Sequence, residues 1–328
     1  MRTEFDIVLP PERLRRLQEQ PVVVIDHPAV FELAGPGALQ CLQGLLTNDV
    51  VGPGDDSLIY GALLTPKGMI VVDYWVVRRS DRILMLAPAA GREASLELFR
   101  RSLPPRLARV NDRTGEAALA WIVGDGLDRV VRGFPLEAGP QPGRVGCVGG
   151  EEGLVLARAP EGAPFQGFVV GPADAVREAA AQMEAAGAAA GDRDDLQAAR
   201  IVAGWPALGA EIDEKTLPQE VRYDEIGGVS YTKGCYTGQE TVARLHFRGH
   251  PNRHLRGLVW EQQPVPGPRE VLQGDRVVGT VRSTLAVGAS AVGLTVLRRE
   301  VQIGETVLAA GAPARVVSLP FAAADLPS

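Results

Sequence analysis

Cys235 is the residue whose sequence surroundings favour chemistry most clearly. It lies in the stretch K-G-C-Y-T-G-Q-E, in which Thr237 and Glu240 match the T-x-x-E pattern of a capping box, so a helix is expected to begin there. Unpaired amides and the positive end of the helix dipole would favour a thiolate at Cys235, and Lys233 adds a positive charge. The pattern indicates a nucleophilic or redox thiol with His246 as a candidate base, or else a half-buried structural cysteine.

Three histidines follow at four-residue intervals. His246, His250 and His254 would share one face of a continuous helix, where they could ligate a metal ion. Gly249 and Pro251 break such a helix, which favours a basic linker instead. The arginines interleaved with the histidines are Arg244, Arg248, Arg253 and Arg256. This cluster could meet a phosphate or an RNA backbone, or it could form a solvated face between two domains.

Composition is that of an ordinary globular protein. The chain has 328 residues and a formal net charge of -6, so it can bury a sizeable core, and its global charge disfavours non-specific binding to nucleic acid. Cys41, Cys147 and Cys235 lie far apart, which predicts neither a disulfide framework nor a cysteine-rich metal site. No signal peptide and no run of about 18 apolar residues is present, so a cytoplasmic protein without a membrane segment is expected.

The elements that must position these residues alternate strands with helices. Strands are expected at residues 22–25, 30–33, 58–64, 69–77, 82–87, 106–112, 117–123, 145–148, 154–157 and 165–170. Helices are expected at 11–20, 39–46, 91–103, 127–134, 174–190 and 192–203. Pro66 and Gly68 predict a hairpin with Lys67 at its tip. Asp73 lies inside a strand, where its carboxylate either faces solvent or lines a site.

Loops and turns separate two regions of different character. Gly149-Gly150 is the expected turn of a second hairpin. Residues 204–228 form a long loop with a short helix after Pro218, and loops of this length usually serve a site or a lid. Beyond Pro251, short β-like runs at 255–260, 276–281, 291–297, 306–308 and 314–319 predict a small antiparallel barrel or sandwich. No G-x-G-x-x-G, Walker or G-x-S-x-G pattern occurs, which argues against the usual nucleotide and hydrolase functions.

The stretch K-G-C-Y-T-G-Q-E at 233–240 resembles the signature K-G-C-Y-x-G-Q-E of the YgfZ-type folate-binding proteins, which are relatives of the glycine cleavage T-protein, an aminomethyltransferase. L-Q-G-L-L-T-N-D-V at 42–50, L-T-P-K-G-M-I at 64–70 and L-P-Q-E at 217–220 resemble further segments of that family. The resemblance implies an α+β fold, a cloverleaf of two interleaved α+β subdomains around a folate pocket, plus a C-terminal antiparallel β-barrel. The expected domains are residues 1–245 and 246–328.

Departures from the enzyme affect the expected activity. Of the G-G-x-x-D-D segment of T-proteins, only Asp73 is retained, and the glutamate that contacts folate corresponds to Val169, which cannot hydrogen-bond a pterin. Arg200, in A-R-I-V-A-G, resembles the arginine of the family's L-R-L-E-A-G and remains available for folate. The missing acid makes aminomethyl transfer the alternative rather than the leading function.

The resemblance implies a tetrahydrofolate-binding protein that supports iron–sulfur cluster assembly or repair, and thereby tRNA-modifying enzymes. Cys235 and Lys233 are the expected functional pair. The residues expected at the folate are Asp73, Arg200, Tyr236, Gln239, Glu240 and Asn48. Iron–sulfur enzymes are the expected clients, with a weak tRNA contact, and no metal ligand set is predicted.

Overall fold

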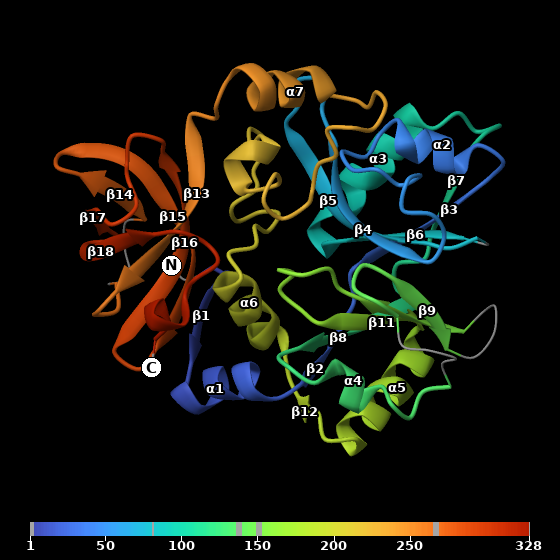
Figure 1. Ribbon diagram of the computed structural model, residues 1–328, viewed down its shortest axis with the longest axis horizontal. Helices are drawn as coiled ribbons and strands as arrows, with labels where there is room; N and C mark the ends of the chain where they lie inside the picture. The colour runs from blue at the N-terminus through green and yellow to red at the C-terminus, as the bar shows by residue number, and fades with distance from the viewer. Residues whose placement is uncertain (1–2, 81, 136–139, 149–152, 265–268, 328) are drawn as a thin grey trace.

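The computed structural model describes residues 3–80, 82–135, 140–148, 153–264 and 269–327. They form three lobes, each built on one β-sheet (Figure 1). The chain enters a six-stranded sheet at β2 (Val22–Asp26), leaves it for a five-stranded sheet at β3 (Ala29–Ala34), and returns at β8 (Ala117–Val123). The two α+β subdomains are therefore interleaved, which confirms the predicted fold class.

The five-stranded sheet is antiparallel, with the strand order β4-β5-β6-β3-β7. Its further members are β4 (Ser57–Leu64), β5 (Ile70–Arg78), β6 (Ile83–Ala87) and β7 (Arg109–Asp112), and its helices are α2 (Ala38–Gln43), a 3₁₀ turn (Ala89–Gly91) and α3 (Arg92–Ser102). Phe31, Tyr74 and Phe99 pack together in the core of this lobe. Because side chains alternate along a strand, Asp73 and Trp75 share the face opposite to Tyr74, toward the centre of the molecule.

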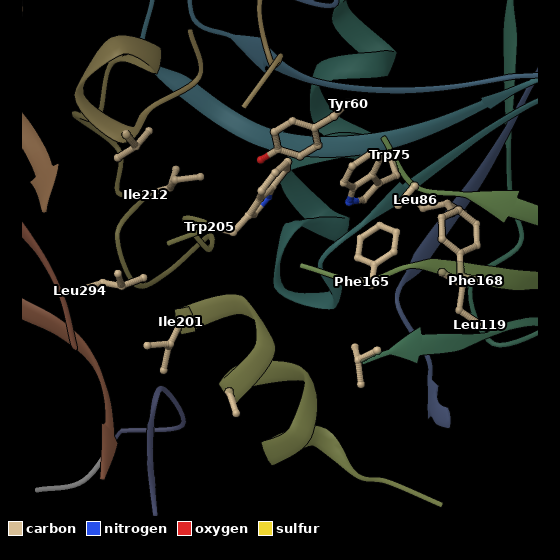
Figure 2. Close-up of a cluster of buried hydrophobic side chains, with 14 of the residues drawn as sticks. Tyr60, Trp75, Leu86, Leu119, Phe165, Phe168, Ile201, Trp205, Ile212 and Leu294 are labelled. Carbon is tan, nitrogen blue, oxygen red and sulfur yellow. The ribbon is translucent and has the colours of Figure 1, made fainter. Parts of the chain in front are cut away.

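The six-stranded sheet has the order β12-β2-β8-β11-β10-β9. Its further members are β9 (Val145–Val148), β10 (Leu154–Arg158), β11 (Gly167–Pro172) and β12 (Ala189–Ala190), with the helices α1 (Pro11–Glu19), α4 (Leu127–Val130), α5 (Ala173–Ala185) and α6 (Arg193–Val202). Small side chains let α5 pack closely on one face of this sheet. The other face contributes Leu119 and Phe168 to the central core, which α6 completes (Figure 2).

The third lobe is a closed antiparallel barrel of six strands: β13 (Arg253–Trp260), β14 (Glu270–Gln273), β15 (Arg276–Val287), β16 (Ser290–Arg298), β17 (Thr306–Ala309) and β18 (Ala312–Val317). The pairing of β15 with β16 closes it. β1 (Asp6–Leu9) adds to β15 in parallel orientation, so a strand from the start of the chain belongs to the barrel sheet. A final 3₁₀ turn lies at Ala323–Asp325.

The chain passes from the body to the barrel through one long connection after α6. The loop after α6 contains the predicted short helix, a 3₁₀ turn at Pro218–Val221, and α7 (Gln239–Arg248) then spans from the five-stranded lobe toward the barrel (Figure 1). The central apolar core draws side chains from all three lobes, among them Trp75, Phe168 and Leu294. The boundary expected at residue 245 stays a prediction.

Most predicted elements are confirmed, with differences at their ends. The helix expected at 127–134 ends at Val130, and the one expected at 174–190 ends at Ala185 because the chain turns at Gly187 to form β12. The strands β1, β12 and β14 were not predicted. The hairpin of β9 and β10 is present, but its expected Gly149-Gly150 turn lies outside the described residues.

Candidate functional site

A cavity of about 560 Å³ opens where the three lobes meet. Its size lies within the range of small-molecule sites. Aromatic side chains form much of its wall, including Trp75, Trp121, Phe165 and Trp205. Trp75 and Trp205 are stacked with ring centroids 5.7 Å apart, and Tyr60 lies against both rings (Figure 2). A flat, partly apolar ligand suits this lining.

Asp73 is the acid that this aromatic wall surrounds. It is 7% exposed and lines the cavity, so the interpretation that it faces solvent is wrong. Its Oδ2 accepts a hydrogen bond of 2.9 Å from the Tyr60 hydroxyl, whereas its Oδ1 is buried and has no hydrogen-bond partner in the described structure. Burial raises the pKa of Asp73 to about 6, against the opposing effect of the Tyr60 hydrogen bond. An unsatisfied buried carboxylate oxygen is costly, so this atom favours a ligand that donates a hydrogen bond.

Arg200 lines the same cavity from α6, but the protein already holds most of its donors. Its Nη1 donates to Glu211 Oε2 at 2.9 Å and to the Trp205 carbonyl at 2.9 Å, and its Nη2 donates to Ser283 Oγ at 2.8 Å. Its Nε donates to Gln197 Oε1 at 2.8 Å. Arg200 therefore fixes the wall of the cavity, and direct contact with a ligand stays a prediction.

The solvent side of the cavity carries charges of both signs. Arg193 and Glu4 form an ion pair of 2.6 Å, with side chains 66% and 52% exposed. Asp26 accepts a hydrogen bond from Trp121 Nε1 at 3.2 Å, and the exposed His27 lies beside it on the wall. Polar ligand groups can therefore remain hydrated at this end while apolar ones enter.

Lys233 does not lie in the cavity. It is 9% exposed, and its ammonium group donates to the carbonyl oxygens of Gln43, Leu46 and Asn48 at 2.7 to 2.8 Å. All three donors of the ammonium group are thus used by the end of α2 and the turn that follows it. Burial lowers the pKa of Lys233 to about 8, and the negative charge of Asp49 opposes that shift. Lys233 fastens its own loop to the segment 42–50.

Cys235 is exposed at the surface of this fastened loop. The capping box predicted for Thr237 and Glu240 is wrong, because the helix begins at Gln239 and no side chain caps it. Its N-cap is Gly238, whose φ of 82° lies in the left-handed region that glycine adopts without a steric penalty. Cys235 therefore precedes the cap by three residues, and the ammonium group of Lys233 points to backbone carbonyls instead.

The remaining residues expected at the folate lie around the same loop, apart from the cavity wall. Tyr236 is 7% exposed, and the Lys233 ammonium lies 5.2 Å from its ring centroid. Asn48 donates to the carbonyls of Tyr60 and Gly227 at 2.8 and 2.7 Å. Gln239 and Glu240 occupy the first turn of α7. None of these residues lines the described cavity, and their role in binding folate stays a prediction.

The four segments that carry the family resemblance meet at this loop. Lys233 binds segment 42–50 and Gly238 packs on the hairpin at 64–70, while Gln219 Nε2 donates to the Val242 carbonyl at 2.8 Å in α7, the helix that follows the loop. Glu220 pairs with Arg253 of the barrel at 2.8 Å. We call these segments, residues 42–50, 64–70, 217–220 and 233–240, the motif cluster. Their shared role in the fold is to dock the Cys235 loop against the five-stranded lobe.

His246 is engaged away from Cys235. Its ring stacks on Tyr231 with centroids 3.6 Å apart, and its Nδ1 lies 3.7 Å from Asp224 Oδ2. His254 lies on β13, so the three histidines do not share a helix. Within the described ranges, no group of three or more histidine, cysteine or acidic side chains is placed to hold a metal ion.

Sequence reasoning missed the aromatic wall. Trp75, Trp121 and Trp205 come from segments far apart in sequence, and their large side chains could equally have been core residues. The one available signal was the carboxylate at 73 inside an apolar strand. Val169, by contrast, packs on the α5 side of its sheet and does not line the described cavity. The inability of a valine to hydrogen-bond a pterin therefore does not bear on the lining of this cavity.

Comparison with known proteins agrees with this geometry. A family model described as the GCVT N-terminal domain matches residues 19–133. An aminomethyltransferase from Rubrobacter xylanophilus is 30% identical over 315 residues, which cover 90% of this chain and 82% of the relative. A tRNA-modifying protein YgfZ from Enterobacter sp. is 28% identical over 77% of this chain and 76% of the relative.

The fold has a solved counterpart. Glycine cleavage system aminomethyltransferase T from Bartonella henselae matches with a TM-score of 0.80 at 18% identity, covering 95% of this chain and 89% of that one. The chain thus belongs to the aminomethyltransferase family of the glycine cleavage T-protein and is related to the YgfZ-type proteins. The resemblance found in the sequence is confirmed. No helix among the described residues is long and apolar enough to cross a membrane.

Proposed function

We propose that this protein binds tetrahydrofolate in the central cavity. The observation that carries the proposal is Asp73 Oδ1, a buried carboxylate oxygen to which no described residue donates a hydrogen bond, set in an aromatic cavity of a folate-related family. The pyrimidinone ring of a reduced pterin is planar and presents N–H donors, so it satisfies both features. Asp73 would accept a hydrogen bond from the ligand, and the stacked Trp75 and Trp205 would form an apolar wall beside its ring.

Tryptophan fluorescence offers a direct test. Three of the four tryptophans, Trp75, Trp121 and Trp205, line the cavity, whereas Trp260 lies in the barrel with its Nε1 bonded to the Ala309 carbonyl. Titration with tetrahydrofolate should therefore quench the fluorescence saturably, and a Trp260→Phe variant should retain the full change in signal. Absence of saturable binding would contradict the proposal.

Asp73→Asn tests the residue that carries the argument. Asparagine keeps the size of the side chain but replaces one acceptor oxygen with a donor. The affinity for tetrahydrofolate should fall by at least about tenfold, since a charged hydrogen bond contributes about 1.5 to 3 kcal/mol. The matched control is Asp174→Asn, an exposed acid on α5 that does not line the cavity.

We further propose that the folate-bound protein acts in the cytoplasm to support iron–sulfur enzymes that modify tRNA, with Cys235 as its functional thiol. The motif cluster supports this idea because it presents Cys235 to solvent on a loop that is docked on both sides of the cysteine, by Lys233 and by Gly238. The names of the YgfZ relatives support the tRNA context. Activity of iron–sulfur tRNA-modifying enzymes should fall in cells that carry Cys235→Ala and persist with Cys41→Ala. Equal activities would remove Cys235 from the proposal.

A weak tRNA contact is proposed for α7. Phe247 is 67% exposed beside the exposed Arg244 and Arg248, and a base can stack on such a ring while guanidinium groups meet phosphates. Binding of a tRNA transcript should weaken with salt and with Phe247→Ala, but not with Ile303→Ala, an exposed barrel residue. Salt-independent or absent binding would dispose of the contact.

The alternative function is aminomethyl transfer. The retained Asp73 in the cavity and the similarity to an aminomethyltransferase support an assay for it. Folate-dependent turnover that survives Cys235→Ala would favour it over a supporting role.

A further inference from the structure

A segment of the chain itself reaches into the cavity with the chemistry of a folate tail. Glu4 and Phe5 both line the cavity wall. Phe5 presents its ring 5.8 Å from the guanidinium carbon of Arg200, and Glu4 presents a carboxylate to Arg193 at 2.6 Å. An aromatic ring followed by a carboxylate is also the composition of the aminobenzoyl-glutamate tail of folates. The two arginines that such a tail could meet are thus already in contact with residues 4 and 5.

The barrel holds this segment in place. Asp6, directly after Phe5, accepts hydrogen bonds from Thr284 Oγ1 at 2.8 Å and from Arg269 Nη1 at 2.5 Å. β1 then continues in parallel with β15, and its Ile7 and Leu9 are 4% and 1% exposed. The segment is therefore anchored on one side of Phe5 by a strand of the core, while Glu4 on the other side is exposed.

The strength of the Glu4 contact suits a competitor that a ligand can displace. An ion pair whose side chains are both more than half exposed contributes little, because water screens it. The carboxylates of a ligand would also stay at this solvent end, since burying them without partners is costly. Arg193 is an exposed cation on the cavity wall that is placed to meet them, because it already binds a carboxylate there.

We propose that Arg193 binds the tail carboxylate of the folate and that Glu4 competes for it. This inference rests on the proposed folate function and adds the residues that select for the tail. It makes affinity depend on the tail: Glu4 lowers the affinity for a ligand with a carboxylate tail and leaves a ligand without one unaffected. The pterin end of the ligand belongs with Asp73, at the buried end of the cavity.

The test compares two ligands on two variants. Glu4→Gln should tighten tetrahydrofolate by about two- to fivefold, the range expected from releasing an exposed ion pair, and Arg193→Gln should weaken it by a similar factor. A tetrahydropterin with a methyl group in place of the tail should bind both variants as it binds the wild type. The matched control is Glu12→Gln, which changes the net charge equally from an exposed position on α1 that does not line the cavity.

Each outcome discriminates. If neither ligand binds the wild type, the proposed folate function fails and the tail argument fails with it. If both ligands bind but Glu4→Gln acts like Glu12→Gln, the folate function stands and the competition is overturned. If Arg193→Gln changes the affinity for the two ligands equally, Arg193 does not bind the tail carboxylate. Glu4 and Arg193 are exposed, so both variants should fold, and their thermal unfolding checks this.

Discussion

At Asp73, burial and hydrogen bonding act against each other. Burial disfavours the charged form and the hydrogen bond from the Tyr60 hydroxyl opposes it, while Oδ1 has no hydrogen-bond partner among the described residues. Tyr60 in turn lies 3.1 Å from the Tyr223 hydroxyl, and burial raises the pKa of both phenols well above 10.0. The phenols therefore stay protonated and act as donors, and Asp73 is the group of this network that titrates near neutral pH.

The stability of the protein should reveal this titration. Because the pKa of Asp73 is raised from 3.8 to about 6, the folded state binds this proton more tightly than the unfolded state. The resulting stabilisation is fully present below about pH 4 and is lost as the pH rises through about 6, a loss of about 3 kcal/mol. Urea unfolding of wild type and Asp73→Asn across this range should show that difference. A gap between the two proteins that does not vary with pH would contradict it.

Lys233 permits a second prediction at the scale of one residue. Lys233→Met keeps most of the volume but leaves three carbonyl oxygens without their donor, one of them in a buried hydrogen bond. We expect a loss of about 2 to 4 kcal/mol in the free energy of unfolding. Lys215→Met, at an exposed position, should change it little and serves as the control. Faster alkylation of Cys235 in Lys233→Met would show that the loop itself has loosened.

The sequence identified chemistry-bearing residues better than it identified their places. Asp73 and Arg200 do line one cavity, yet Lys233 and Asn48 carry their polar atoms into backbone contacts. A lysine two residues from a cysteine looks like an electrostatic partner in a linear sequence. The three carbonyls that hold its ammonium group lie about 190 residues earlier, and no local pattern announces a contact of that range.

At the scale of elements, two glycines determine how the Cys235 loop docks. Gly238, at a φ of 82°, would place a Cβ 2.7 Å from the Thr65 carbonyl oxygen and 3.0 Å from the Gly68 Cα. Gly68, at a φ of 87°, would meet Thr241 in the same way. The hairpin of β4 and β5 and the start of α7 can therefore approach closely only with glycine at both positions.

Gly238→Ala should consequently cost more than the backbone conformation alone. A left-handed alanine costs about 1 to 2 kcal/mol, and the contact with Thr65 adds to that cost. Gly227→Ala is the matched control, because Gly227 has a φ of 67° and no atom within 4 Å of the added Cβ. The difference between the two variants in the free energy of chemical unfolding isolates the packing cost. Equal losses of unfolding free energy would mean that the hairpin of β4 and β5 can shift to make room for the added Cβ.

Element types were more predictable than element ends. The helix expected at 192–203 is present as α6, and the structure adds a capping box formed by Asp192 and Asp195, which was not predicted. The same kind of pattern at Thr237 and Glu240 failed, because Gly238 already terminates the preceding turn and packs against the hairpin. β1 and β12 escaped prediction because short strands owe their existence to distant partners, here β15 and β2.

At the scale of the whole molecule, the barrel is joined to the cavity wall by a buried polar network. A bulge in β15 between Val281 and Ser283 interrupts its regular pairing with β16. Ser283 Oγ donates to Glu211 Oε1 at 2.5 Å and accepts from Arg200, while Glu211 is 1% exposed and also accepts from the Ala207 amide at 3.0 Å. α6, the loop after it and the barrel thus share one set of hydrogen bonds.

This network should couple the stability of the barrel to that of the body. Glu211→Gln and Ser283→Ala each remove part of the set, so the second substitution should cost less once the first is made, with an interaction energy of about 1 kcal/mol or more. The measurement is a double-mutant cycle of urea unfolding. The control cycle uses Ser290→Ala in place of Ser283→Ala. Ser290 is a barrel serine whose hydroxyl donates to the Val287 carbonyl and not to Glu211. The losses of unfolding free energy from Ser290→Ala and Glu211→Gln should therefore add within about 0.5 kcal/mol. If Ser283 also proves additive with Glu211, this network does not couple the two lobes, and the shared apolar core holds them together.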